Sequence, residues 1–172
     1  MRALADMALE QIRAIEGMCD FFEIAAVRNT IKEIVPATLP PDVAALVNIP
    51  TWVGLGTVGL WAALDGLAYR AELKPAFKCT CGIRCMRALF QRYAEGAAAD
   101  SLGELDDLRH LYAHNFAGDV DETYLKHVKR HVLSRPVMLT CGAYFNGHKV
   151  QLDLTHLRAY SGTVRSVLEK FR

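Results

Sequence analysis

The fold of this chain is decided by a stretch in its second half, residues 105–118, which has the sequence LDDLRHLYAHNFAG. Ser101 precedes the stretch and Glu104 follows three residues later, a capping-box spacing that predicts a helix starting at about Leu102. The asparagine and the glycine near the end of the stretch are residues at which helices stop. We therefore predict a helix from about Leu102 to about His114.

The predicted helix has one apolar face and one polar face. Its apolar residues recur at the three- and four-residue steps that keep side chains on one side of a helix, so this face should be buried. It consists of Leu105, Leu108, Leu111 and Tyr112. The neighbouring face carries the titratable groups Asp107, His110 and His114. A functional site is therefore expected on the polar face.

Arg109 and His114 are well suited to chemistry on a phosphate, because arginine binds phosphate oxygens and histidine exchanges protons near neutral pH. Their spacing of five residues corresponds to about 140° of rotation on a helix of 3.6 residues per turn. The two side chains therefore do not converge on a regular helix. Either the helix unwinds near Asn115 and brings His114 round, or the side chains meet across a symmetric dimer interface.

The order of residues in this stretch resembles the signature of the HEPN superfamily, the higher eukaryotes and prokaryotes nucleotide-binding domains. An arginine and a polar residue are followed by a histidine and an asparagine, then by a glycine, an aspartate and a tyrosine. These residues are Arg109, His110, His114, Asn115, Gly118, Asp121 and Tyr124. The resemblance covers roughly Asp100 to the C-terminus. Phe116 stands where many toxin members have a tyrosine, so regulation through that tyrosine is not expected here.

The resemblance implies an all-α fold and a metal-independent endoribonuclease of HEPN type that cleaves single-stranded RNA and needs no cofactor. Such proteins act as toxins or defence components. The expected partners are RNA, a second copy of the chain in a homodimer, and an antitoxin or a nucleotidyltransferase.

RNA supplies its own nucleophile, the 2′-hydroxyl, so such an enzyme needs only a base, an acid and a cation for the charge on the phosphate. We expect His114 to be the general base or acid and Arg109 to bind the phosphate. His110 would be a second polar contact, Asn115 would orient the loop or bind the phosphate, and Asp107 would orient His110. Cleavage would leave a 2′,3′-cyclic phosphate.

Two other interpretations of the same residues are open. Arg109 is spaced to pair with Asp106, and His114 would be favourable at a helix C-terminus, in which case the domain is a non-catalytic HEPN-like module for binding or dimerisation. Alternatively, His110 and His114 are four residues apart, a spacing at which two imidazoles can share a metal ion with Asp106 or Asp107. The glutamate of an HExxH site does not follow His110.

Composition limits what the chain can bind. At 172 residues it is long enough for one domain, 1–172, with a well-buried core. A net charge of +1 and a pI near 7.7 do not fit a globally basic nucleic-acid binder, so contact with RNA requires a local patch. We expect that patch at Lys126, Lys129 and Arg130, near the histidine motif; a solvated helix face is the alternative.

The five cysteines, an odd number, and the lack of a signal-peptide pattern fit the reducing cytoplasm. Three thiols lie close together, at Cys79, Cys81 and Cys85. They are candidate zinc ligands, but the chain has no CxxC pair, so free thiols are the other interpretation.

The first half of the chain predicts two helices joined by a proline-rich turn. An amphipathic pattern covers residues 1–35. Residues 43–64 form an uncharged run that is long enough to cross a membrane. Pro50 and three glycines within the run make a membrane span less favourable. We predict a buried central helix from about Thr51 to Leu73. The alternative places its apolar residues in a dimer interface: Val53, Leu55, Val58, Leu60 and Trp61.

The remaining segments complete an all-α prediction. A helix is expected from Arg84 to about Ala98, and a last helix from about Thr155 to Arg172. Between them, residues 137–141 and 149–154 are β-prone and predict a small hairpin. The whole is a HEPN-like bundle of about five to six helices with this hairpin before the last one.

Overall fold

The structure is a computed structural model and describes residues 1–27, 49–71, 73, 89–114, 137–146, 149–150 and 152–172. Most of these residues are helical, which confirms the prediction of an all-α bundle. The helices are α1 (Arg2–Val27), α4 (Ile49–Arg70), α6 (Ala97–His114) and α8 (Leu154–Glu169). Three short strands, β1 (Val137–Met138), β2 (Tyr144–Asn146) and β3 (Lys149–Val150), form a small antiparallel sheet.

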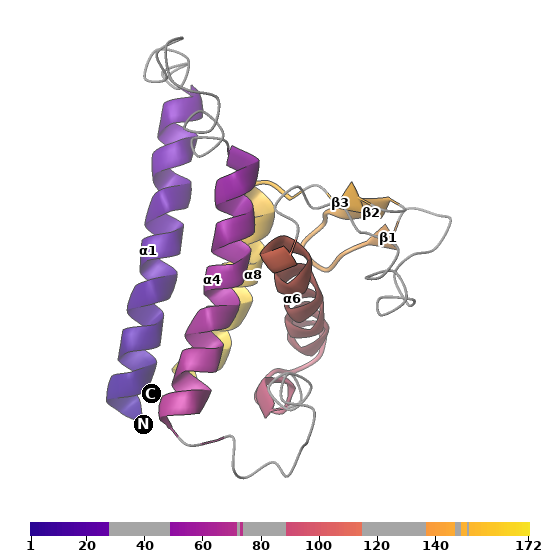
Figure 1. Cartoon of the computed structure of the whole chain (residues 1–172). Coiled ribbons are helices and arrows are strands. Elements are labelled where there is room, and N and C mark those ends of the chain that lie inside the picture. The colour runs from indigo at the N-terminus through magenta and orange to yellow at the C-terminus, as the bar shows by residue number, and fades with distance from the viewer. Residues whose placement is uncertain (28–48, 72, 74–88, 115–136, 147–148, 151) are drawn as a thin grey trace.

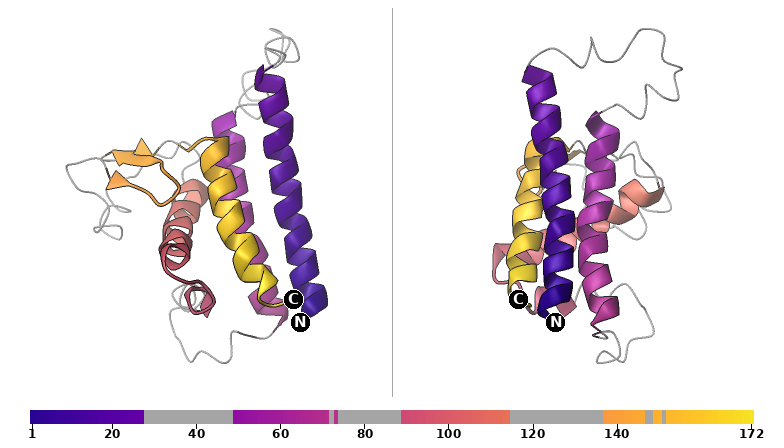
Figure 2. Two further views of the ribbon diagram at one scale, coloured as in Figure 1. Left: turned by 180° about the vertical axis from the view of Figure 1, so that it is seen from behind. Right: turned by 90° about the vertical axis from the view of Figure 1, so that its left-hand side faces the viewer.

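Helices α1, α4 and α8 lie side by side, and α6 packs on α4 and α8 on the side away from α1 (Figure 1). Figure 2 shows the same arrangement from behind and from the side, with both chain ends at one end of the bundle. The small sheet lies beyond α6. Helices α4 and α8 therefore each pack against the other three long helices.

Helix α4 confirms the predicted central helix, although it ends at Arg70 instead of near Leu73. Val53, Leu60 and Trp61 are buried within the chain itself, so these three are not available to a dimer interface. Leu55 is 41% exposed and Val58 is partly buried, and a part for them in such an interface stays a prediction. Among the helices of the described ranges, none combines the length and the apolar character that a membrane crossing requires.

The glycines of α4 let its neighbours approach closely. A Cβ atom on Gly54 would lie 2.7 Å from a ring carbon of Tyr112 in α6. One on Gly56 would lie 2.5 Å from a methyl carbon of Leu157 in α8. Gly59 faces α1 in the same way, with a side-chain carbon of that helix 3.1 Å from where its Cβ would be. Each of these three glycines thus makes room for a different helix.

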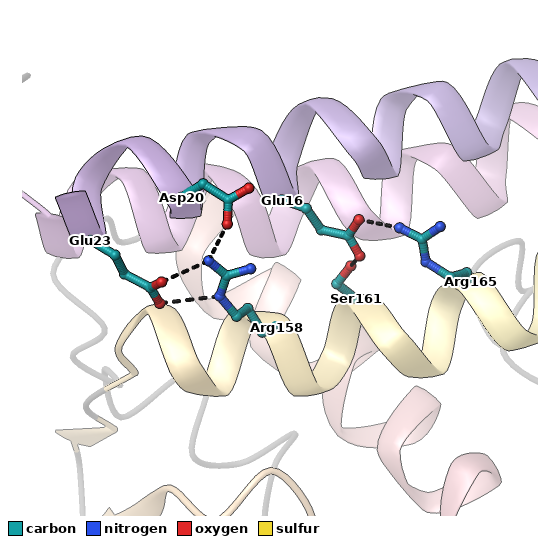
Figure 3. A network of polar contacts seen from close by, with 6 residues as sticks. All are labelled: Glu16, Asp20, Glu23, Arg158, Ser161 and Arg165. Atoms are coloured by element: carbon teal, nitrogen blue, oxygen red, sulfur yellow. Dashed lines mark hydrogen bonds and ion pairs between the residues drawn. The ribbon is translucent and has the colours of Figure 1, made fainter.

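Helices α1 and α8 are joined by a polar network (Figure 3). Arg158 donates hydrogen bonds to Asp20 at 2.5 Å and to Glu23 at 2.8 and 3.1 Å. Glu16 accepts a hydrogen bond from Ser161 at 2.6 Å and forms an ion pair with the next arginine of α8. Because each charge has a partner on the other helix, the network favours one register of α1 against α8.

Helix α6 begins at Ala97, before the predicted start at Leu102. The helix predicted from Arg84 to about Ala98 does not continue that far, because the chain is helical at 89–91 and then turns. Gly96 in this turn has φ of +52°, a left-handed conformation that glycine adopts readily. The apolar face of α6 is as predicted, with at most 4% of each side chain exposed: Leu105, Leu108, Leu111 and Tyr112.

The predicted hairpin is wrong in its pairing. The sequence paired residues 137–141 directly with 149–154, but β2 lies between the two segments. Val137 of β1 is opposite Phe145 of β2, and the other side of β2 pairs with β3. The extra strand was missed because it is three residues long and follows a tight turn at Gly142, where φ is +91°.

Several predictions fall outside the described residues. The first helix is confirmed as far as Val27, while its expected continuation to residue 35 and the proline-rich turn are not described. The cysteine cluster at 79–85 and the basic patch at Lys126, Lys129 and Arg130 also lie outside.

Candidate functional site

Arg109 is held between two helices. Its Nε donates a hydrogen bond to Oδ1 of Asp106 at 2.8 Å, one turn earlier on α6. Its guanidinium carbon lies 5.1 Å from the ring centroid of Trp61, a buried residue of α4. An arginine at this distance over an aromatic face gains a cation–π attraction. The guanidinium is thus fixed in position before any ligand arrives.

His110 lies beside Arg109. Its Nδ1 is 2.9 Å from the backbone oxygen of Asp106 and 3.6 Å from the carboxylate of the same residue. Its Nε2 is 3.4 Å from a terminal nitrogen of Arg109. A neutral imidazole that donates from Nδ1 to the carbonyl presents Nε2 as an acceptor on the Arg109 side. The structure therefore places Asp106 beside His110, in the orienting position that the sequence assigned to Asp107.

Among the predicted site residues, the structure brings Arg109 and His110 together. Asp107 lies between them and the start of the helix and is partly exposed. His114 is the last residue of α6, but its side chain lies outside the described part of the chain, as does Asn115. The approach of His114 to Arg109 therefore stays a prediction.

A second polar cluster was not foreseen from the sequence. Glu104 accepts hydrogen bonds from the backbone N–H of Thr140 at 2.9 and 3.1 Å and from its hydroxyl at 2.6 Å. The buried hydroxyl of Tyr160 donates to the same carboxylate at 3.0 Å. Ser101 and Thr140 share a further hydrogen bond of 2.6 Å. Ser101 and Glu104 therefore dock the turn after β1 onto α6, instead of starting the helix as a capping box.

Burial changes the acidity of this region. Burial raises the pKa of Tyr112 to about 12, although a hydrogen bond from the main chain of Leu152 opposes part of the effect. Burial is also the main cause of a raised pKa at Tyr160 and at Cys141. These groups are therefore neutral at physiological pH, and Cys141 is a thiol there, not a reactive thiolate.

Within the ranges that the structure describes, no three His, Cys, Asp or Glu side chains are grouped so that they could hold a metal ion. The histidine pair proposed as metal ligands includes His114, whose side chain is not among those described. Trp61 is the residue of the site that sequence reasoning missed, because its helix is apolar all round and offers no pattern that links it to Arg109.

Comparison of the chain with protein-family models, with curated proteins and with solved structures gave no match.

Proposed function

We propose that the chain is a metal-independent endoribonuclease of HEPN type that cleaves single-stranded RNA. The observation that carries the proposal is the fixed guanidinium of Arg109 with the imidazole of His110 beside it at 3.4 Å. Nε is the atom that donates to Asp106, and a terminal nitrogen of the same guanidinium lies 3.4 Å from Nε2 of His110, so the ion pair orients the guanidinium toward the imidazole. Orientation before binding lowers the entropy lost when a phosphate is bound.

In this proposal, Arg109 binds the scissile phosphate and stabilises the charge that develops on it. His114 is the general base or acid, and His110 is a second polar contact with the phosphate or the 2′-hydroxyl. Asn115 orients the loop or binds the phosphate, and Asp107 adds an acidic group on the same helix. Lys126, Lys129 and Arg130 would bind the RNA backbone. An antitoxin or a nucleotidyltransferase would be the natural partner of a toxin of this kind.

The test is cleavage of a panel of labelled RNAs by the purified protein in EDTA. We expect wild-type cleavage, with His114→Ala lowering the rate at least about a hundredfold, as the loss of a general acid or base does. Arg109→Lys keeps a cation next to Asp106 but loses the planar fork, so it should also impair cleavage strongly.

Arg13→Ala is the matched control. Arg13 pairs with Glu10 at the same three-residue spacing as Arg109 with Asp106, but on the exposed side of α1. Its removal should leave cleavage unchanged. Cleavage that survives in His114→Ala and in Arg109→Lys would refute the proposal, and cleavage abolished by EDTA would point to the metal-dependent alternative.

A second candidate function is a non-catalytic module for binding or dimerisation. The observation that favours it is that Asp106 and Trp61 already give Arg109 a structural role. Under this alternative no RNA of the panel is cut by folded wild-type protein.

A further inference from the structure

The two ring nitrogens of His110 face groups of opposite hydrogen-bonding character. Nδ1 lies 2.9 Å from the backbone oxygen of Asp106 and 3.6 Å from its carboxylate, and a carbonyl and an ionised carboxylate can only accept hydrogen bonds. Nε2 lies 3.4 Å from a terminal nitrogen of Arg109, and a guanidinium can only donate. The three contacts therefore favour the same neutral tautomer, with the proton on Nδ1 and the free lone pair on Nε2.

Asp106 holds both of the groups that take part. Its carboxylate is 6% exposed and accepts a hydrogen bond from Nε of Arg109 at 2.8 Å, while its carbonyl lies beside the ring of His110. The three residues lie within about one turn of α6, so the helix itself fixes their spacing. The imidazole is 26% exposed, so a ligand can reach it. The lone pair of Nε2 is thus placed next to the proposed phosphate-binding group.

We propose that His110 is the general base of the cleavage reaction and that Asp106 is the residue that positions it. This inference rests on the proposed ribonuclease function, and it replaces the role of second polar contact with a defined step. It also leaves the role of general acid to His114.

The proposed reaction begins when Nε2 of His110 takes the proton of the 2′-hydroxyl as the 2′-oxygen bonds to phosphorus. The bond between phosphorus and the 5′-oxygen then breaks, and that oxygen leaves with a proton from His114. Arg109 stabilises the negative charge on the other phosphate oxygens. The products are a 2′,3′-cyclic phosphate and a 5′-hydroxyl, and exchange of protons with water returns both histidines to their starting states.

The charges at the site suit this step. The imidazolium that forms at His110 lies beside the guanidinium of Arg109, which is unfavourable for two like charges. The carboxylate of Asp106, 3.6 Å from Nδ1, and the phosphate bound to Arg109 compensate for this repulsion. Asp106 would thus fix the tautomer and stabilise the imidazolium, as the aspartate does beside the histidine of a Ser-His-Asp triad.

The contact between Arg109 and Nε2 is compatible with use of this lone pair. At 3.4 Å it is longer than a normal hydrogen bond between nitrogen and its acceptor. A phosphate binds a guanidinium through shorter, charge-assisted hydrogen bonds. Binding of the phosphate should therefore displace the weak contact and free Nε2 for the 2′-hydroxyl.

His110→Gln distinguishes a general base from a polar contact. Glutamine still forms hydrogen bonds but does not take up a proton near neutral pH, so we expect the rate of RNA cleavage to fall at least about a hundredfold. The matched control is His156→Gln on α8. His156 also lies against an aspartate, 2.9 Å from Asp153, and glutamine suits its place in the capping box of that helix. Cleavage by His156→Gln should equal that of wild type.

A modified substrate separates the base from the acid. In an RNA with sulfur in place of the 5′-bridging oxygen at the scissile linkage, the leaving thiolate needs no proton. We expect this substrate to restore cleavage by His114→Ala but not by His110→Gln. Restored cleavage by His110→Gln would assign the role of acid to His110 and overturn the inference.

Two measurements test the role of Asp106. Asp106→Asn keeps an oxygen for Arg109 and the backbone carbonyl for His110 but removes the charge, so kcat should fall at least about tenfold while KM changes little. Nitrogen-15 NMR of the full-length wild-type chain under mildly alkaline conditions should show His110 as the Nδ1–H tautomer. The NMR measurement requires no variant to fold, and circular dichroism should show that each variant is folded.

The outcomes separate this inference from the function on which it rests. Equal cleavage by wild type and His110→Gln, an Nε2–H tautomer of His110, or an Asp106→Asn variant that alters KM alone would overturn the inference. If Arg109→Lys and His114→Ala were still impaired, the ribonuclease function would stand without it. Folded wild-type protein that cuts no RNA would overturn the function and the base together.

Discussion

Asp106 and Arg109 form an ion pair of 2.8 Å in which the carboxylate is almost fully buried and the guanidinium is not, with side-chain exposures of 6% and 20%. Loss of the partner is therefore more unfavourable for the carboxylate than for the guanidinium, because water can reach the guanidinium but scarcely reaches the carboxylate. A buried charge that loses its partner is strongly unfavourable, whereas the pair itself contributes little net stability. The same arginine thus serves the fold and is the proposed phosphate-binding group.

Arg109→Ala should lower the free energy of unfolding by about 2 kcal/mol, because it leaves the Asp106 carboxylate buried without a cation. Arg13→Ala, which breaks an exposed pair of the same spacing, should lower it by less than about 0.5 kcal/mol. Urea titration of both variants measures the difference. Adding Asp106→Asn to Arg109→Ala should restore most of the lost stability, and a double variant no more stable than the single one would contradict this account.

Gly56→Ala should destabilise the protein by about 1–3 kcal/mol, because the new methyl group would meet Leu157 at 2.5 Å in a packed core. Gly54→Ala should behave similarly against the ring of Tyr112. Gly66→Ala is the control on the same helix, since nothing lies within 4 Å of its Cβ position. Alanine there should stabilise the helix by up to about 1 kcal/mol. Thermal unfolding of the three variants measures these changes. A melting temperature of Gly66→Ala at or below those of Gly54→Ala and Gly56→Ala would contradict the prediction.

Stability should fall as the pH rises above 10. The pKa of Tyr112 is about 12 in the folded chain against 10 in the unfolded chain, so the unfolded state loses its proton first. The stability that protonated Tyr112 contributes to the folded chain is fully present below pH 10 and is lost progressively between pH 10 and about 12. Denaturant titrations at a series of pH values measure this slope, and Tyr112→Phe should reduce it. At pH 11, absorbance at the phenolate band should be lower for the folded chain than for the denatured one.

Glu104→Ala should destabilise the chain by about 1–3 kcal/mol, because it removes the carboxylate that accepts from the buried hydroxyl of Tyr160. It should also release the turn after β1, so the amides of Thr140 and Gly142 should exchange with solvent faster. Glu95→Ala is the control, since that carboxylate is 92% exposed in its pair with Lys170. Equal exchange rates in the two variants would show that Glu104 does not dock the turn.

The sequence predicted those features that depend on one helix at a time. The apolar face of α6 and the central position of α4 follow from periodicity and from the lack of charge, because burial acts on every turn of a helix in the same way. The pair Asp106 and Arg109 also follows from helical spacing.

Features that depend on two distant segments were not predicted. Ser101 and Glu104 have the spacing of a capping box, but both side chains form hydrogen bonds with Thr140 instead. Thr140 lies 39 residues after Ser101 and 36 residues after Glu104. Trp61 meets Arg109 only because α4 and α6 pack together, and no local pattern links the two residues. The carboxylate beside His110 is a different case, because Asp106 is four residues earlier on the same helix and this spacing was already visible in the sequence.

The pairing of α1 with α8 has a consequence for how the chain is made. Arg158 binds Asp20 across an interval of 138 residues, so α1 leaves the ribosome long before α8 and lacks one of its two partner helices until α8 emerges. The buried face of α1, which includes Ile12 and Phe22, is then partly uncovered throughout synthesis. A nascent chain of this kind is a natural substrate for chaperones. A chain that stops at residue 152 should accordingly be cut within α1 by protease, and resistance of α1 in that truncated chain would show that α4 alone suffices to protect it.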